Sequence, residues 1–318
     1  MKHYVDKEPI IAAFPSVLQI EVTSKCNLAC VMCPSTDLTR PRQNMDLALF
    51  EKIIAEAKGK SELAILHLMG EPLINPELDK MIKICKQANI RSVISTNGML
   101  LDEQRQKSLC RSGLDTVILS FDGARKETYE KVRRGAKYER VKSNIEQFLK
   151  IKDRPHAVVQ MISLDLTCRE QEEFKKLWEK YSADVLSKPY TKWQGNLEKI
   201  NRLGGGDHPA LENKVCDRLW KWATIMQDGT VVPCCRDYDA TIQFGNLRHN
   251  SIKEIWNNRK FADFRSKHAA GRNNLPICKN CDYDPIIFND VIGLIGTTLF
   301  DSYSILRLMY NLNYLNDG

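Results

Sequence analysis

The sequence has no apolar run long enough to cross a membrane and no pattern typical of a secretion signal. The uncharged stretch between Asp290 and Asp301 is well short of the roughly 20 apolar residues that a membrane-spanning helix needs. Residues 1–10 read MKHYVDKEPI, with charges and a proline where a signal peptide would have its apolar core. These absences predict a cytoplasmic protein with no membrane span.

Blocks of like charge are also missing. Lys and Arg outnumber Asp and Glu by 47 to 40, but the two signs are mixed along the chain. Nucleic-acid-binding proteins concentrate their basic residues on one surface, so we predict no nucleic-acid partner. The chain has 318 residues, of which 43% are hydrophobic, and this favours one large domain with its own core plus a smaller one.

Short apolar runs alternate with helical patterns up to about residue 190. Buried strands that alternate with amphipathic helices form parallel sheets, so this pattern predicts an α/β fold with an open or partly closed sheet. Functional residues in such sheets lie in the loops after the C-terminal ends of the strands. The six predicted strands are residues 17–22, 63–68, 92–95, 116–120, 157–164 and 184–187, and helical spacing occurs in 49–57, 78–85, 138–149 and 174–181.

A segment rich in turn residues, LGGGDHP at 203–209, predicts a domain boundary near residue 200. We therefore assign residues 1–200 to the large domain and residues 201–318 to a small one. The small domain is predicted to hold a hairpin near 224–232 and helices near 251–267 and 286–312. Its core is small, which suggests that bound metal adds to its stability.

Eleven cysteines are present, and they fall into groups. Cytosolic thiols stay reduced, so clustered cysteines are predicted to be metal ligands rather than disulfides. Cys26, Cys30 and Cys33 follow the first strand with the spacing C-x3-C-x2-C. Three thiolates in one loop can hold three irons of a [4Fe-4S] cubane and leave the fourth iron open. A structural zinc ion would need a fourth ligand, and none is nearby in the sequence.

With this motif the sequence resembles the radical S-adenosylmethionine (SAM) superfamily, whose signature is this cysteine spacing after the first strand of a partial (β/α)6 barrel. The resemblance implies a [4Fe-4S] cluster on Cys26, Cys30 and Cys33, with SAM bound at its open iron. It also implies reductive cleavage of SAM to a 5′-deoxyadenosyl radical that abstracts a hydrogen atom from the substrate. A flavodoxin- or ferredoxin-like partner would donate the electron.

Other segments match the family in the expected order. Met69-Gly70-Glu71-Pro72 resembles the G-G-E-P turn that contacts the SAM ammonium group, with Met69 in place of the first glycine. The segments that contain Thr96 and Asn97, and Ser120 and Asp122, resemble those that contact the ribose and methionine of SAM. Met32 stands where the family usually has an aromatic residue beside adenine. The resemblance therefore implies a SAM site formed by Met32, Gly70, Glu71, Thr96, Asn97, Ser120 and Asp122.

A second cysteine group lies near the C-terminus. Cys216, Cys234, Cys278 and Cys281 have the spacing C-x17-C-x43-C-x2-C, which resembles the SPASM extension of radical SAM enzymes. No cysteine follows Cys281 to hold a further cluster, so the pattern resembles the shortened twitch form with one auxiliary [4Fe-4S] cluster. Cys235 competes with Cys234 for one ligand position, and Cys234 is the preferred ligand. A structural zinc site is the alternative for these four cysteines.

Several isolated residues carry weaker hypotheses. Cys85 and Cys110 are predicted to pack as small hydrophobic residues. His67 is either a satisfied interior histidine or a proton shuttle. Asp165 and Lys188 end the fifth and sixth strands and would point toward the substrate. Arg133 or its neighbour Arg134 could pair with the SAM carboxylate.

The twitch-like spacing resembles that of radical SAM dehydrogenases that oxidise a secondary alcohol of an aminocyclitol. The resemblance implies dehydrogenation of a small-molecule sugar or cyclitol alcohol with help from the auxiliary cluster. One alternative is radical modification of a peptide or protein, as in SPASM-type maturases. An alternative of another class is a non-catalytic, zinc-stabilised binding protein.

Overall fold

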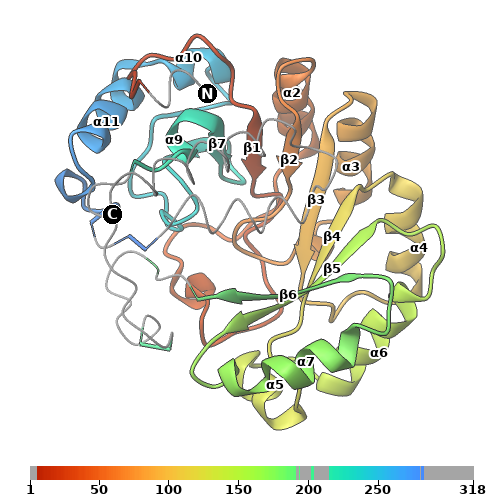
Figure 1. Cartoon of the computed structure of the whole chain (residues 1–318). Helices are drawn as coiled ribbons and strands as arrows, with labels where there is room; N and C mark the ends of the chain where they lie inside the picture. Colours follow the sequence, from red (N-terminus) through yellow and green to blue (C-terminus); the bar gives the residue numbers. More distant parts are fainter. Residues whose placement is uncertain (1–5, 191–192, 194–201, 204–214, 280, 283–318) are drawn as a thin grey trace.

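A computed structural model describes residues 6–190, 193, 202–203, 215–279 and 281–282 (Figure 1). Within this part of the chain, nine strands form one sheet in the order β6-β5-β4-β3-β2-β1-β7-β8-β9. The strands are β1 (Val17–Ile20), β2 (Leu63–Ile65), β3 (Arg91–Thr96), β4 (Thr116–Ser120), β5 (His156–Ser163), β6 (Asp184–Pro189), β7 (Trp222–Ile225), β8 (Thr230–Val232) and β9 (Gly245–Asn246).

Helices connect the parallel strands, and side chains cap several of them. Asp46 precedes α2, and its carboxylate accepts a hydrogen bond from Leu49 N at 2.8 Å. Ser251 and Glu254 form a capping box at the start of α10. No helix in the described ranges is long and apolar enough to span a bilayer. The α-helices are α2 (Leu47–Ala57), α3 (Leu78–Gln87), α4 (Glu103–Ser112), α5 (Lys126–Val132), α6 (Tyr138–Leu149), α7 (Gln171–Trp178), α9 (Arg218–Lys221), α10 (Ile252–Trp256) and α11 (Arg259–Ala269). The 3-10 turns are η1 (Pro34–Asp37), η2 (Pro72–Ile74), η3 (Cys168–Glu170) and η4 (Arg272–Asn274).

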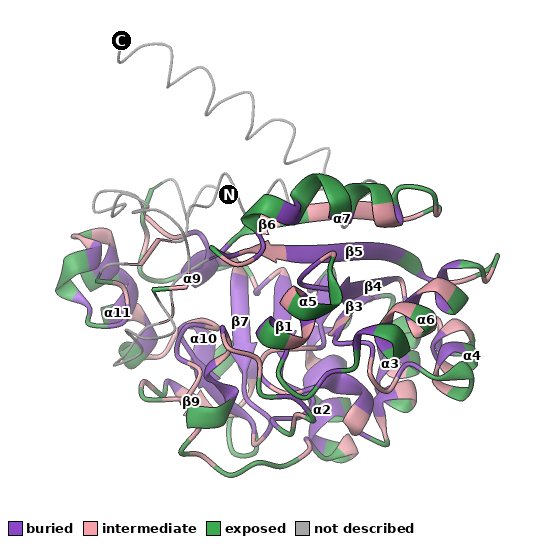
Figure 2. Ribbon diagram, turned by 90° about the horizontal axis from the view of Figure 1, so that it is seen from below, coloured by how far each residue is buried: buried purple, intermediate pink, exposed green. Residues whose placement is uncertain are grey.

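Strands β1 to β6 pair in parallel, and the sheet becomes antiparallel only at β7–β8 and β8–β9. All six strands expected from the apolar runs are present, with ends that differ by a few residues. The predicted α/β fold class with a parallel sheet is therefore confirmed. Figure 2 shows the central strands as largely buried ribbons, with β6 at the edge more exposed, whereas the outer faces of the helices are exposed.

The two faces of the parallel sheet bury different sets of side chains. Leu18, Ile20 and Ala64 belong to the large core that the helices cover. Side chains alternate between the faces of a strand, so their neighbours Val17 and Ile65 point to the opposite face. There they belong to a separate apolar cluster that joins strands β6 to β7 across the inside of the curved sheet. We call this cluster the apolar floor; its members are Val17, Leu63, Ile65, Val93, Ile118, Val158, Leu186 and Trp222.

The C-terminal segment continues the same sheet. Strand β7 pairs in parallel with β1, with Val17 opposite Trp222, and β8 then returns antiparallel to β7. The hairpin expected near residues 224–232 is present, as are α10 and α11 in the region predicted as helical. The expected boundary near residue 200 and the expected helix at 286–312 lie outside the described residues. The boundary thus stays a prediction. Strand β7, which lies C-terminal to it, extends the large sheet.

Arg265 holds the C-terminal segment together. Its fully buried guanidinium lies 4.3 Å from the ring centroid of Trp256 and 4.0 Å from that of Phe261. It donates hydrogen bonds to the carbonyl oxygens of Leu219 at 2.8 Å and Pro9 at 3.0 Å. One side chain therefore joins α11, the end of α9 and the N-terminal segment.

Candidate active site and auxiliary cysteine site

The first cysteine loop follows β1 and is hydrogen-bonded to the C-terminal end of α5 and the residues just beyond it. Ala29 N donates to Arg134 O at 3.0 Å, and Val31 N donates to Val132 O at 2.9 Å. Burial raises the pKa of the Cys26 thiol to about 11 and that of Cys30 to about 12. Three half-buried thiols in one fixed loop fit a cationic metal cluster, because metal binding displaces their protons and stabilises the thiolates.

The Gly-Glu-Pro turn packs directly against the strand end that precedes this loop. Gly70 has φ +80°, and a Cβ atom there would lie 2.4 Å from the carbonyl oxygen of Thr23. Glu71 N donates to Lys25 O at 2.8 Å. Only glycine fits such a close backbone approach with a positive φ, so the turn and the cysteine loop form one unit.

Glu71 brings the next predicted residues together. Its carboxylate accepts a hydrogen bond from Thr96 Oγ1 at 2.7 Å and from Asn97 N at 2.7 Å. Asn97 Nδ2 donates in turn to Asn27 Oδ1 at 2.9 Å. Burial raises the pKa of Glu71, while the hydrogen bonds from Asn97, Thr96 and Leu73 act against this shift. The predicted residues 71, 96 and 97 thus lie beside the cysteine loop at the C-terminal ends of β1 to β3.

Asp122 accepts hydrogen bonds within the protein that the sequence did not reveal. Arg133 donates to Asp122 Oδ2 from Nε at 2.8 Å, and Ile162 N donates to Asp122 Oδ1 at 2.6 Å. Both carboxylate oxygens are therefore occupied by protein donors. Arg133, considered above as a partner of the SAM carboxylate, is paired with Asp122, and its contact with SAM stays a prediction. Contact between Asp122 and SAM stays a prediction.

Met32 and Ser120 are the remaining residues of the predicted SAM site. Met32 is 5% exposed and belongs to an apolar cluster with Val132, Leu164 and Tyr190. Ser120 shares a hydrogen bond of 3.1 Å with the hydroxyl group of Ser95 on the neighbouring strand. The apolar cluster around Met32 is suited to a flat aromatic ligand such as adenine.

Glu21 and Arg40 form a buried ion pair that sequence reasoning missed. Arg40 Nη2 lies 2.6 Å from Glu21 Oε1, and Arg40 Nη1 also donates to Gln227 Oε1 at 2.5 Å. Backbone amides of Met69 and Gln227 donate to the Glu21 carboxylate, both at 3.3 Å. The pair therefore ties the Gly-Glu-Pro turn to the hairpin of the C-terminal segment. A lone carboxylate in the apolar run VLQIEV was the available signal.

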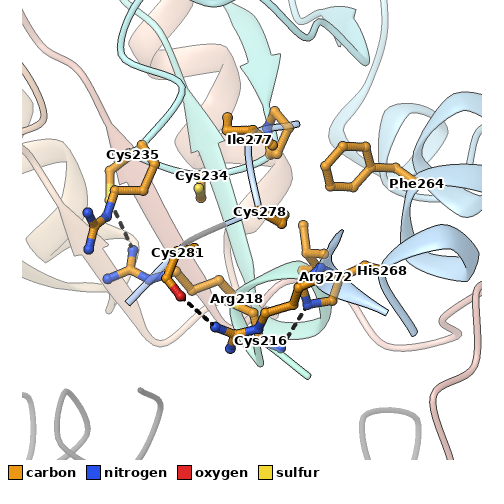
Figure 3. Close-up of a pocket in the computed structure, with 13 residues that line it drawn as sticks. Cys216, Arg218, Cys234, Cys235, Phe264, His268, Arg272, Ile277, Cys278 and Cys281 are labelled. Atoms are coloured by element: carbon orange, nitrogen blue, oxygen red, sulfur yellow. Dashed lines mark hydrogen bonds between the residues drawn. The ribbon is translucent and has the colours of Figure 1, made fainter. Parts of the chain in front are cut away.

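The second cysteine group lines a cavity between β8, α11 and the last described residues. Figure 3 shows Cys216, Cys234, Cys278 and Cys281 around this space, with Cys235 at its edge. Cys216 N donates to His268 Nε2 at 2.9 Å, and Arg218 Nη1 donates to Cys235 Sγ at 3.6 Å. Burial and the neighbouring thiols raise the pKa of Cys234, and burial raises that of Cys216 to about 12.

The arrangement of these cysteines fits a multi-iron cluster better than zinc. A tetrahedral zinc ion would bring its thiolate sulfurs to about 3.8 Å from one another. Among the described residues, no three His, Cys, Asp or Glu side chains converge closely enough to hold a single ion. The basic side chains of Arg218, Arg236 and Arg272 line the same cavity and complement the negative charge of a thiolate-ligated cluster.

Two family models match the chain. The radical SAM superfamily matches residues 20–166, and SPASM, an iron-sulfur cluster-binding domain, matches residues 216–282. The protein belongs to the radical SAM superfamily and carries a C-terminal SPASM domain. It is an enzyme whose cofactors are a [4Fe-4S] cluster with SAM and an auxiliary iron-sulfur cluster.

Curated proteins that are similar in sequence to this chain are named for different reactions. The tungsten-containing aldehyde ferredoxin oxidoreductase cofactor-modifying protein of Pyrococcus furiosus is 26% identical over 90% of this chain and 91% of its own length. The 2-deoxy-scyllo-inosamine dehydrogenase of Niallia circulans is also 26% identical, over 84% of this chain and 92% of its own.

Solved structures agree with the fold. A structure of that dehydrogenase type, BtrN with SAM and 2-DOIA, has a TM-score of 0.58 at 22% identity and covers 86% of this chain and 95% of its own. SuiB of Streptococcus suis, bound to its precursor peptide, has a TM-score of 0.59 at 15% identity, covering 82% of this chain and 69% of its own. At these identities the likeness concerns the fold, and the relatives include both small-molecule and peptide enzymes.

Proposed function

We propose that this enzyme dehydrogenates a secondary alcohol of a small sugar- or cyclitol-like molecule. When bound, SAM and the first cluster supply a radical that removes the hydrogen atom on the carbinol carbon, and the auxiliary cluster supplies an acceptor for the electron left behind. The hydroxyl proton leaves to a base, so the substrate loses two hydrogens in total and becomes a ketone. The relative that resembles this chain in auxiliary cysteine spacing has such a dehydrogenase name.

The observation that carries this proposal is the position of Lys188 at the end of β6. Burial lowers the pKa of Lys188, and the nearby charges of Asp122 and Cys235 act in the opposite direction. Asp122 belongs to the region of the first cysteine loop, and Cys235 lines the auxiliary cavity. A small molecule beside Lys188 would therefore lie between the two cysteine sites, where it could lose a hydrogen atom on one side and an electron on the other.

Isotope transfer tests this function. A panel of cyclitols and sugar acids, each deuterated at its carbinol carbons, is incubated anaerobically with reconstituted enzyme, reductant and SAM. We expect deuterium in 5′-deoxyadenosine and a product two hydrogens lighter than the substrate. Cys278→Ala should stop product formation and leave some SAM cleavage, because the first cluster keeps its own ligands. A redox-neutral product, or modification of a peptide instead, would contradict the dehydrogenase proposal and leave the radical SAM assignment intact.

A further inference from the structure

The same pair of residue types recurs on neighbouring strands of the curved sheet. A member of the apolar floor is followed two positions later by a polar side chain, on all seven strands from β6 to β7. Residues two apart lie on the same face of a strand, so these side chains also point to the inside of the sheet, about 6.7 Å further along. We call them the polar ring; its members are Gln19, His67, Ser95, Ser120, Gln160, Lys188 and Thr224.

Interactions of several members agree with a shared inner face. The hydroxyl groups of Ser95 and Ser120 are 3.1 Å apart. Gln19 Nε2 donates to the backbone oxygen of His67 at 3.4 Å. Lys188 on β6 is close enough to His67, beyond the end of β2, to lower the pKa of that histidine. The charge of a side chain on β6 thus reaches a side chain beyond β2, as expected if both lie on the inside of the curved sheet.

The next step along the same face reaches the SAM site. Two residues beyond Ser95 is Asn97, and two residues beyond Ser120 is Asp122. Both belong to the set described beside the first cysteine loop. The polar ring therefore lies between the apolar floor and the site where the radical forms, as a substrate chamber requires.

Three buried atoms of the ring have no hydrogen-bond partner within the described part of the chain. They are Gln19 Oε1, His67 Nδ1 and Thr224 Oγ1. Gln19 is 7% exposed and Thr224 is 1% exposed, so bulk water does not satisfy them. Buried polar groups in native proteins are almost always hydrogen-bonded, and these three point to a hydroxylated ligand.

The charge of the chamber is positive. Burial and the charge of Lys188 lower the pKa of His67 to about 4. Burial also lowers the pKa of Lys188, so an anionic ligand beside Lys188 would stabilise its charged form. Arg218 lies with its guanidinium 4.1 Å from the ring centroid of Trp222 in the floor, and its charge acts on Lys188. The nearby carboxylate of Asp122 is already paired with Arg133.

We infer that the polar ring binds the substrate, and that the substrate is a small hydroxylated molecule with one anionic group held by Lys188. The inference rests on the proposed function and specifies its substrate class. Gln19, His67 and Thr224 bond the hydroxyl groups, and Lys188 binds a carboxylate or a phosphate. An inosamine, by contrast, carries an amine, and its cationic form would be repelled by Lys188 and Arg218.

A binding experiment tests this class without turnover. Four hexose probes of similar size are titrated calorimetrically into anaerobically reconstituted protein with SAM: glucuronate, glucose 6-phosphate, glucose and glucosamine. We expect at least one anionic probe to bind about tenfold tighter than glucose, and glucosamine to bind weakest. Comparison of glucuronate with glucose 6-phosphate distinguishes carboxylate from phosphate.

Variants locate the binding in the ring. Lys188→Met should abolish the preference for anions, whereas Lys176→Met, an exposed lysine of α7, should preserve it. Thr224→Val removes only a hydroxyl group and should weaken all sugar probes alike. Iron content and SAM cleavage report that each variant is folded. Tightest binding of glucosamine, binding of no probe, or an anion preference that survives Lys188→Met would overturn the inference. Deuterium transfer from a cationic cyclitol would overturn the inference of an anionic substrate and support the dehydrogenase proposal. Binding of an anionic probe without deuterium transfer would support the anionic substrate class and contradict the dehydrogenase proposal.

Discussion

Arg133 Nη2 lies 2.6 Å from Asp122 Oδ2, and the two side chains are 8% and 0% exposed beneath the first cysteine loop. Removal of one partner of a buried ion pair leaves the other charge without compensation. We therefore predict that Asp122→Asn lowers the free energy of unfolding by about 3–5 kcal/mol. Anaerobic denaturant titration measures this loss.

Two further variants make that prediction specific. Asp122→Asn combined with Arg133→Met removes both charges and should recover most of the lost stability. Glu173→Gln breaks the exposed pair between Glu173 and Arg125 and should change stability little, since exposed ion pairs contribute little. Equal losses in Asp122→Asn and Glu173→Gln would show that the buried pair has no special role.

The two cysteine groups should hold their clusters independently. They belong to different loops, so we expect about eight irons per reconstituted chain and about half of that iron in the Cys26→Ala, Cys30→Ala, Cys33→Ala triple variant. The triple variant should also lose SAM cleavage. Iron analysis and anaerobic absorption spectra measure both results, and an unchanged iron content would refute the role of this loop.

Cys234 and Cys235 should differ when each is replaced. Both line the cavity, in a turn after β8 that is closed by a hydrogen bond from Asp237 N to Cys234 O at 3.1 Å. The Cys235 thiol already accepts a hydrogen bond from Arg218, which favours Cys234 as the ligand. We predict that Cys234→Ala loses the auxiliary cluster and that Cys235→Ala, which removes the acceptor of the Arg218 hydrogen bond, largely keeps it. The opposite iron contents would assign the ligand to Cys235.

His67 should make the protein sensitive to acid. Its pKa is lowered to about 4 by burial and by the charge of Lys188, whereas an unfolded chain binds this proton below about pH 6.5. Between those two values the unfolded state binds more protons, so the contribution of His67 lowers stability as the pH falls. His67→Asn should flatten the loss of melting temperature from about pH 6.5 to about pH 5. His249→Asn, on the exposed surface, is the matched variant; equal slopes in both variants would refute the prediction.

Local patterns predicted most of the fold and part of the site. The six strands were recoverable because each is a short apolar run between turn residues, and the first cysteine loop because its three ligands are close in sequence. The residues 71, 96 and 97 followed from their motifs. The pairing of Asp122 with Arg133 did not, because the intervening α5 has to form before the two side chains meet.

The polar ring was missed for a different reason. Gln19 and His67 are single polar residues inside the apolar runs VLQIEV and LAILHL, where the sequence does not show which face of the strand they share with other residues. Their common face becomes evident only when seven strands are aligned in register, which requires non-local pairing. The ladder between β1 and β7 is equally non-local, since about two hundred residues separate its two strands.

That ladder also determines whether the chain can be shortened. A protein ending after β6 would leave β1 as an edge strand, with a row of unpaired N–H and C=O groups along residues 17–20. Such an edge is a template for pairing with other chains, so the shortened protein would tend to aggregate even with its first cysteine loop intact. By covering the edge of β1, strand β7 of the SPASM domain thus protects the chain from self-association, in addition to the domain's role in cluster binding.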